Sequence, residues 1–232
     1  MKLVYCLPGK DFTGEFLDSW TMMLLLPPPA GIRGEGIEFV YNREYSSDIY
    51  ACRNNLVRTH PHTQIKSRRE VFDGYTYDYM FWIDSDMQWK GEDILRLLKH
   101  DENIVTGIAP LGAHQGTCVG KYREEDGKKV VSYYSMRGVL EEERNEKGLV
   151  EIDFCGFGFI AVKKGVMERI GYPWFQTVIH NHEGNQVATS EDIGWCSRAK
   201  EHGFTIYADP EVRIGHKKEI LYRADHYEYQ KN

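Results

Sequence analysis

The chain has 232 residues, of which 41% are hydrophobic and 13% aromatic, and its formal net charge is −6. A chain of this length buries about 70–75% of its unfolded surface, enough for one large domain or for two lobes that share a core. Because acidic and basic residues are interspersed and the balance is acidic, we do not expect a protein that binds nucleic acid through a general positive field.

The first half of the chain alternates strand-like and helix-like patterns. Short runs of apolar, β-branched and aromatic residues predict strands at residues 3–7, 37–41, 79–84 and 104–107. Apolar residues at helical spacing predict helices at residues 14–26, from the N-cap Asp48 to about Thr59, and from residue 91 to about 98. Such alternation is typical of a mostly parallel sheet that is covered by helices and receives nucleotides at the carboxyl ends of its strands.

The second half is less regular, and residues 112–148 are rich in glycine, tyrosine and charge. The expected elements are a hairpin at 119–134 turning at Asp126-Gly127, a strand-like run at 150–162, helices at 163–170 and 190–202, and strands at 205–208 and 211–214. Residues 141–144, His60-Pro61-His62 and His180-Asn181-His182 are expected to be polar loops or a solvated helix face. The tail from Ile220 has no assignable pattern.

Five cysteines are spread singly along the chain, at Cys6, Cys52, Cys118, Cys155 and Cys196. The absence of a C-x-x-C pair argues against a zinc ribbon or a redox dithiol and favours reduced thiols in a cytoplasmic compartment. The longest apolar run, residues 22–29, is too short to cross a bilayer and ends in three prolines. We therefore expect no stable membrane insertion.

The strand expected at Tyr79–Ile83 ends in two acids, Asp84 and Asp86. In an extended backbone both side chains point to the same face of the sheet, where their charges repel each other unless a cation lies nearby. Asp-x-Asp is common by chance, but the end of a buried strand is where α/β sheets bind ligands. A divalent ion that carries a phosphorylated substrate fits this arrangement.

A second pair of acids, Glu191 and Asp192, opens the helix expected after Ser190. One explanation is structural, because Ser190 can cap the helix and the acids are favoured near its positive end. The alternative is catalytic, because a hydroxyl acceptor is a poor nucleophile until a carboxylate takes its proton. In that case Asp192 is the expected base, and Glu191 orients the acceptor or supports the base.

His216 follows the last expected strand. It is either a surface histidine or a neutral imidazole that completes a metal site with Asp86, and such mixed ligands suit manganese better than magnesium. Lys217, Lys218 and Arg213 lie beside it in the sequence and could hold a diphosphate.

Two further segments are open to a structural or a ligand-binding interpretation. Gly156 and Gly158 interrupt an apolar run, which indicates either close approach of the backbone to a ligand or tight packing. Pro8-Gly9 follows the first strand, where α/β folds receive a nucleotide, although it forms neither a dinucleotide fingerprint nor a P-loop. Arg53 and Asn54 could reach a base or a phosphate, or be exposed polar residues.

Taken in order, four segments resemble the GT-A glycosyltransferase fold, and most closely small family 2-type nucleotide-sugar transferases. These segments are "CRNNLV" (52–57), "DYMFWIDSDM" (78–87), "DFCGFGFIAVKKGVMERIG" (153–171) and "SEDIGWCSRAKEHGFTIYADPEVRIGH" (190–216). The resemblance implies a single domain over residues 1–232, with a mixed, mostly parallel sheet and a small acceptor-side sheet. Residues 1 to about 110 would bind the nucleotide sugar and about 111–232 the acceptor. The compact size is similar to that of transferases from large viruses and phages, which would place the protein in the host cytoplasm.

The resemblance also implies a role for each matching residue. The metal, Mn²⁺ or Mg²⁺, would be bound by Asp86 and His216, with Asp84 contacting it through water or binding the ribose. Asp192 would be the base of an inverting transfer from a UDP-sugar to a glycan or another hydroxyl acceptor, with Glu191 beside it. The remaining donor contacts would come from Pro8, Gly9, Arg53, Asn54, Ser85, Gly156, Gly158 and Lys218.

Two alternatives stay open at this point. A sugar-nucleotide nucleotidyltransferase also uses an α/β sheet and acids that bind metal, but it usually begins with a basic, glycine-rich loop, and residues 7–12 contain only one glycine and one lysine. A non-catalytic binder of nucleotide sugars or glycans would explain the aromatic content, but it gives no reason for Asp192. Retaining transferases share the fold and the Asp-x-Asp motif, so inversion rests on Asp192 alone.

Overall fold

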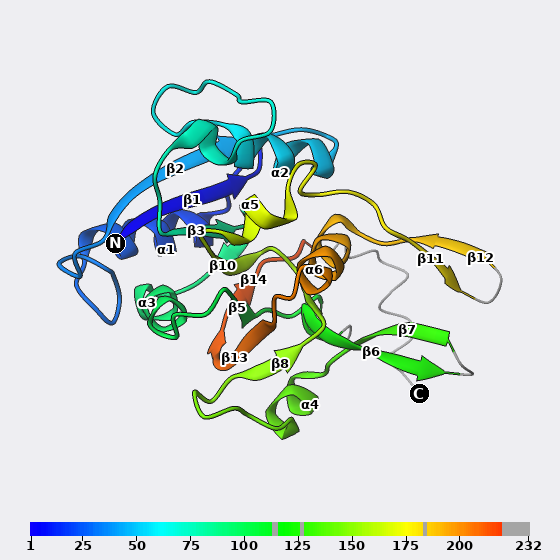
Figure 1. Ribbon diagram of the computed structural model, residues 1–232. Coiled ribbons are helices and arrows are strands. Elements are labelled where there is room, and N and C mark those ends of the chain that lie inside the picture. Colours follow the sequence, from blue (N-terminus) through cyan, green and yellow to red (C-terminus); the bar gives the residue numbers. More distant parts are fainter. Residues whose placement is uncertain (113–115, 126–127, 183–184, 220–232) are drawn as a thin grey trace, which may run out of the picture.

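The computed structural model describes residues 1–112, 116–125, 128–182 and 185–219. A seven-stranded sheet runs through its centre in the order β2-β1-β3-β10-β5-β13-β8 (Figure 1). Its strands are β1 (Lys2–Pro8), β2 (Glu38–Glu44), β3 (Tyr79–Ile83), β5 (Ile104–Ile108), β8 (Val150–Ile152), β10 (Phe159–Lys163) and β13 (Ile206–Arg213). Strands β10 and β8 run against the other five. The expected mixed, mostly parallel sheet is therefore confirmed.

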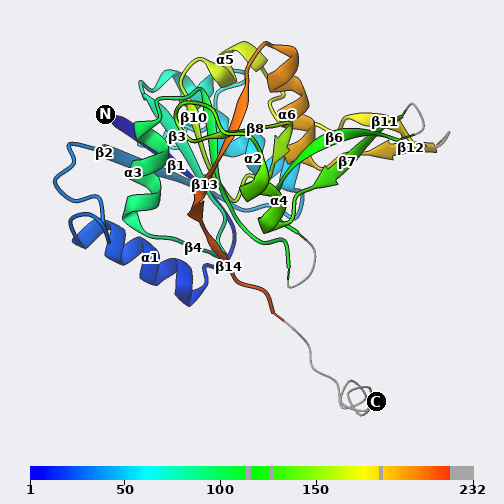
Figure 2. The ribbon, with the colours of Figure 1, turned by 90° about the horizontal axis from the view of Figure 1, so that it is seen from below.

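Helices cover both faces of this sheet. They are α1 (Gly14–Leu25), α2 (Ile49–Arg58), α3 (Gly91–Lys99), α4 (Met136–Glu141), α5 (Val166–Ile170) and α6 (Glu191–Glu201), with a short 3₁₀ turn at Val71–Gly74. Figure 2 shows α1 and α3 on one face of the sheet and α2, α5 and α6 on the other. Within the described residues, none of the helices has the length and hydrophobicity that crossing a bilayer requires.

The alternation of side chains along the strands produces two separate cores. On β1, Leu3, Tyr5 and Leu7 pack beneath α1 and α3, whereas Val4 and Cys6 pack beneath α2, α5 and α6. Strand β3 divides in the same way and is buried on both faces, which explains why its sequence is an unbroken apolar run.

Three small sheets surround the central one. They are β4 (Met87–Gln88) with β14 (Gly215–His216), β11 (Ile179–His182) with β12 (Asn185–Ala188), and β7 (Lys128–Tyr133) with β6 (Val119–Glu125) and β9 (Phe154–Cys155). The pairing of β6 with β7 confirms the expected hairpin, whose turn at Asp126-Gly127 lies outside the described residues, as does the tail from Ile220.

Several expectations for the second half were wrong. Residues 179–182 form a strand rather than a polar loop, and α5 begins at Val166 because Lys163 still belongs to β10. The two strands expected at 205–208 and 211–214 are one strand, β13, whose register shifts after Ala208. Pro210 lies between the two expected strands, but a proline at a shift of register need not end a strand.

Candidate functional site

Two hollows lie at the edge of the sheet where β1, β2 and β3 end. The first, which we call the strand-end hollow, has a volume of about 290 Å³. It is lined by Pro8, Gly9, Tyr45, Ser46, Ile49, Cys52, Asp84, Ser85 and Asp86. Gly9 adopts φ +149°, and a Cβ atom there would lie 2.7 Å from Ser85 Cβ, so this loop packs closely only with glycine.

The second hollow, which we call the inner hollow, has a volume of about 200 Å³ and shares Asp84 with the first. It also contains both acids of α6 and His216. Its remaining lining residues are Arg53, Met87, Gly107, Ala109, Leu111, Cys118, Gly156, Phe157, Gly158 and Phe159. The two hollows together thus gather the early acid pair, the late acid pair and the late histidine.

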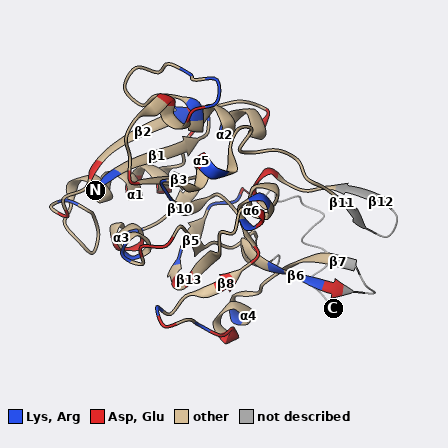
Figure 3. Ribbon diagram, viewed as in Figure 1, with Lys and Arg blue, Asp and Glu red and all other residues tan. Residues whose placement is uncertain are grey.

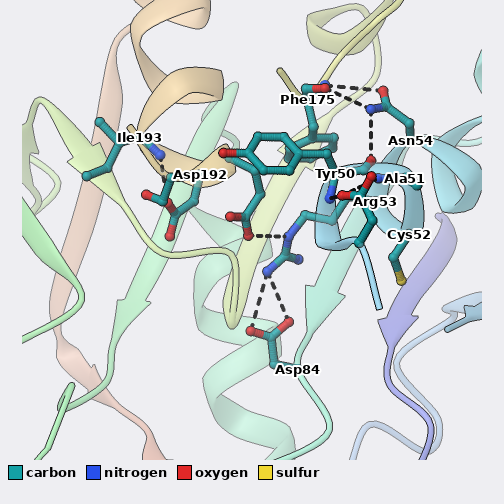
Figure 4. A network of polar contacts seen from close by, with 12 residues as sticks. Tyr50, Ala51, Cys52, Arg53, Asn54, Asp84, Phe175, Asp192 and Ile193 are labelled. Atoms are coloured by element: carbon teal, nitrogen blue, oxygen red, sulfur yellow. Dashed lines mark hydrogen bonds and ion pairs between the residues drawn. The ribbon is translucent and has the colours of Figure 1, made fainter. Parts of the chain in front are cut away.

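Arg53 is a buried cation that lines the inner hollow and points toward Asp84 (Figure 4). Its side chain is only 4% exposed, and its Nε donates to Glu191 Oε1 at 3.0 Å while Nη2 lies 3.4 Å from Asp84 Oδ1. Its guanidinium also lies over the rings of Trp82 and Phe157. Burial opposes the charge of Arg53, but the neighbouring carboxylates outweigh it and raise the pKa of the guanidinium.

In an extended backbone Asp84 and Asp86 would point to the same face of the sheet. In the structure they do not. Strand β3 ends at Ile83, and the amide of Met87 donates to the carbonyl of Asp84, so the chain turns between the two acids. Asp84 faces Arg53, and burial raises its pKa although Arg53 opposes the shift. Asp86 faces away from Arg53, toward His216.

The β4–β14 ladder brings Asp86 and His216 together. His216 pairs with Met87 in this ladder, and its Nε2 lies 3.0 Å from Asp86 Oδ2. Its Nδ1 lies 2.7 Å from the carbonyl oxygen of Pro110, which can only accept, so Nδ1 carries a proton and Nε2 faces the carboxylate. The hydrogen bond to Asp86 raises the pKa of His216. Burial alone would raise the pKa of Asp86, but His216 and Lys218 outweigh it and lower that pKa.

The segment after β14 adds positive charge to the same place. The amide of Lys217 donates to the carbonyl of Asp86, and Lys217 Nζ donates to Glu15 at 2.9 Å. Lys218 Nζ lies 3.5 Å from Asp86 Oδ2 and is partly exposed. Lys218 therefore places positive charge beside Asp86, which lines the strand-end hollow.

The donor groups at Asp86 and His216 fit a divalent ion whose other ligands come from substrate and water. No group of three or more His, Cys, Asp or Glu side chains within the described ranges is arranged to hold an ion alone. A carboxylate oxygen and an imidazole nitrogen nevertheless converge, and the second ring nitrogen is fixed by a backbone carbonyl, as is usual for histidines that bind metal. Two protein ligands are enough where phosphates supply the others.

Asp192 lies in the inner hollow at the start of α6. Ser190 was expected to cap this helix, but its hydroxyl donates to Asp192 Oδ1 instead, and it makes no side-chain capping bond to the backbone. Burial and then the charge of Glu191 raise the pKa of Asp192. A Cβ atom on Gly156 would lie 3.6 Å from Asp192 Oδ2, an ordinary contact distance, so Gly156 lies beside this carboxylate in the inner hollow.

The structure places the other predicted site residues as follows. Glu191 forms an ion pair with Arg53, so it is better placed to hold Arg53 in position than to contact an acceptor. A Cβ atom on Gly158 would lie 2.3 Å from Met87 Cε. The backbone of Gly158 is therefore packed against the Met87 side chain, next to Asp84. Asn54 is buried, and its amide bonds the backbone of Tyr50, Trp174 and Phe175 outside both hollows.

Sequence reasoning missed Tyr45 and Ser46, which line the strand-end hollow, and Cys118, which lines the inner one. Tyr45 and Ser46 directly follow the carboxyl end of β2, a position that would have identified them had the strand been extended past Tyr41. No local signal marks Cys118, because the contact of β6 with β9 brings it there.

No protein-family model matches the sequence, and no curated protein matches it. Among solved structures, the crystal structure of A197 from STIV aligns with a TM-score of 0.50 and 14% identity over 96% of this chain and 97% of that one. GalNAc-T7, crystallised with UDP, GalNAc and Mn²⁺, aligns with a TM-score of 0.49 and 9% identity over 94% of this chain and 44% of that one. At 14% identity, the likeness to A197 supports the fold alone. Together with the strand order, it confirms a GT-A-like α/β architecture.

Proposed function

We propose that the protein is a metal-dependent glycosyltransferase that moves a hexosyl group from a UDP-sugar to a hydroxyl acceptor. The observation that carries the proposal is the convergence of Asp86 with His216 beside a hollow that also contains Asp192. The first pair supplies hard and borderline donors for a divalent ion, and the third residue is a carboxylate placed to accept a proton. The substrates are inferred from this chemistry and from the resemblance of the four sequence segments.

In this proposal the strand-end hollow receives the nucleotide. Pro8, Gly9 and Ser85 would line the nucleoside and phosphate positions, with Asp84 close to the ribose. Asp86 and His216 would hold Mn²⁺ or Mg²⁺, which when bound neutralises charge that develops on the departing diphosphate. Lys218 would add a second positive charge at the diphosphate, where it would exchange its contact with Asp86 for one with phosphate.

The inner hollow would hold the transferred sugar and the reacting hydroxyl of the acceptor. Its volume of about 200 Å³ suits one monosaccharide better than a chain of several. Asp192 would take the proton of the acceptor hydroxyl as that oxygen attacks the anomeric carbon from the face opposite the diphosphate, which inverts the configuration. Arg53 would keep Glu191 in place beside the base.

The test compares UDP-sugar hydrolysis and transfer by the unmodified protein with and without Mn²⁺. We expect turnover to require the ion and Asp86→Ala to lower it by at least about 100-fold, because the diphosphate would lose its charge partner. Asp18→Ala is the matched control, since it removes an exposed acid of α1 that lies outside both hollows. Full activity of Asp86→Ala would contradict the metal assignment.

A further inference from the structure

A third hollow, which we call the edge hollow, lies on the outer strand of the central sheet, away from the site described above. It has a volume of about 540 Å³, within the usual range for sites of small ligands. One wall is strand β2 and the other is the loop that follows α2, both at the top of Figure 1. Its lining residues are Phe39, Val40, Tyr41, Arg43, Pro61, His62 and Gln64.

Two aromatic side chains in this hollow are exposed although they belong to the central sheet. Phe39 is 38% and Tyr41 is 55% exposed. Both are held from behind, because Phe39 packs edge-on against Tyr5 at 5.8 Å and Tyr41 against Trp20 at 6.3 Å. The side chains are two residues apart on one strand, so they present apolar surface from the same face. Exposed rings fixed by packing form a ready platform for a ligand with flat apolar surface, such as a sugar ring.

The polar groups of the edge hollow favour a negatively charged ligand. Arg43 lies over the ring of Phe12 at 5.9 Å, and within the described residues its guanidinium has no ion-pair partner. His62 packs against Tyr75 at 5.3 Å on the opposite wall. None of the described lining residues is acidic, although the whole chain has 35 Asp and Glu residues. A guanidinium without an ion-pair partner beside fixed aromatic rings is available to bind carboxylate or sulfate.

The loop that forms one wall of the edge hollow is also mainly basic. Residues 58–70 contain four Lys and Arg side chains and one acidic residue, in a chain whose net charge is −6. The Lys and Arg positions on the loop after α2 are blue in Figure 3. Lys66 is bound to Glu44 at 2.6 Å, but Arg68 and Arg69 are exposed. This local positive field would concentrate an anionic ligand near the hollow.

We propose that the edge hollow is a second, non-catalytic carbohydrate site that binds an anionic glycan. Sugar rings would stack on Phe39 and Tyr41, and acidic groups of the glycan would bind Arg43, with His62 and Gln64 as hydrogen-bond partners. A peptide strand added to the edge of β2 is disfavoured, because residues 61–64 face that edge across the hollow and would have to move. The proposal does not depend on the transferase assignment, since the edge hollow shares no lining residue with the strand-end hollow or the inner hollow.

The test is fluorescence polarisation with a labelled hexamer of galacturonic acid, without nucleotide or metal. We expect saturable binding that weakens with salt, and a loss of about tenfold or more in affinity for Tyr41→Ala and for Arg43→Ala. Tyr172→Ala and Arg137→Ala are the matched controls. Tyr172 is 44% exposed and packs edge-on against Trp174, and Arg137 is exposed on α4; both should bind the hexamer like the unmodified protein.

Three results would overturn the proposal: no saturable binding by the unmodified protein, equal binding by both edge-hollow variants, or a labelled oligothymidylate hexamer binding at least as tightly through the same residues. The last result would make the surface a nucleic-acid site. Thermal unfolding of each variant shows whether it is folded. If the hexamer does not bind, the transferase proposal is unaffected. If the protein has no transferase activity, the binding measurement still tests the edge hollow.

Discussion

At the scale of single residues, Arg53 determines how acids from two parts of the chain coexist. Asp84 follows β3 and Glu191 opens α6, and both carboxylates bind the same guanidinium. Without that cation the partly exposed Asp84, the buried Glu191 and nearby Asp192 would repel one another. The sequence predicted Arg53 to be either a nucleotide contact or an exposed polar residue. It did not reveal that Arg53 is buried with a partner 138 residues away.

Replacing Arg53 with methionine should destabilise the fold strongly. The change keeps much of the apolar volume but leaves the buried Glu191 and the partly exposed Asp84 without their partner, which costs about 3 kcal/mol of unfolding free energy. For a chain of this size that corresponds to a fall in Tm of roughly 6–12 °C. The control is Arg137→Met, which breaks an exposed pair with Glu141 and should change the unfolding free energy by less than about 0.5 kcal/mol. Equal effects in a thermal melt would argue against a structural role for Arg53.

The pH dependence of turnover should report on Asp192. A base must be ionised to accept a proton, and burial and Glu191 raise the pKa of Asp192 above its ordinary value of about 3.9. Turnover should therefore fall as the pH is lowered through this raised pKa, so the acid limb should lie above the range of a solvated aspartate. Asp192→Asn should lose about 100- to 10,000-fold in turnover while still binding UDP. An acid limb near pH 4 would contradict the role of Asp192, as would an active Asn variant.

At the scale of elements, those formed by local interactions could be predicted from the sequence, whereas those formed by contacts between distant residues could not. Helix α2 was predicted with its cap, since Asp48 accepts hydrogen bonds from the amides of Tyr50 and Ala51 and this signal is local. The β4–β14 ladder could not be predicted, because each strand has two residues and exists only through its partner. That ladder aligns Asp86 with His216, so the residues of the candidate metal site were predictable but their means of assembly was not.

A second polar cluster ties α3 to β13 and is expected to be purely structural. Asp209 is fully buried and lies 2.5 Å from Arg96 Nε and 2.7 Å from His100 Nε2. Asp209→Ala should cost about 2–3 kcal/mol of unfolding free energy at neutral pH. Glu211→Ala, which breaks a more exposed pair with Arg144, should cost less than about 1 kcal/mol.

The same cluster has a predictable pH dependence. Burial would raise the pKa of Asp209, but hydrogen bonds from Arg96 and His100 outweigh it, so the pKa in the folded protein is lowered. The contribution to stability is then fully present above the unfolded-state pKa of about 3.9 and is lost as the pH falls through the lower folded value. Denaturant titrations should show a larger difference between the unmodified protein and Asp209→Ala at pH 5 than below about pH 4. A constant difference down to pH 2 would contradict this account.

At the scale of the whole molecule, the two halves share one sheet. Strand β10, from the second half, lies between β3 and β5 of the first and pairs with both. The alternation in the first half predicted a sheet but not this insertion, because the sequence of an apolar five-residue strand does not show which strands it pairs with. The two halves expected from the sequence, residues 1 to about 110 and about 111–232, therefore share one sheet and are interleaved in space.

This interleaving predicts that the first half is not stable alone. A fragment of residues 1–110 would leave the edges of β3 and β5 without β10 and would expose apolar residues of both cores. It should show no cooperative thermal transition by circular dichroism, whereas the full chain should unfold in one. A cooperative transition in the fragment would mean that residues 1–110 form an independent unit.

The most direct test of the account is a crystal structure of the protein with UDP and Mn²⁺. We expect the ion to be bonded to a carboxylate oxygen of Asp86 and to Nε2 of His216, with the diphosphate completing its ligands in the strand-end hollow. Lys218 should then contact phosphate rather than Asp86. An ion and diphosphate bound away from Asp86 and His216, or UDP bound with equal affinity and position without any ion, would contradict the proposed function.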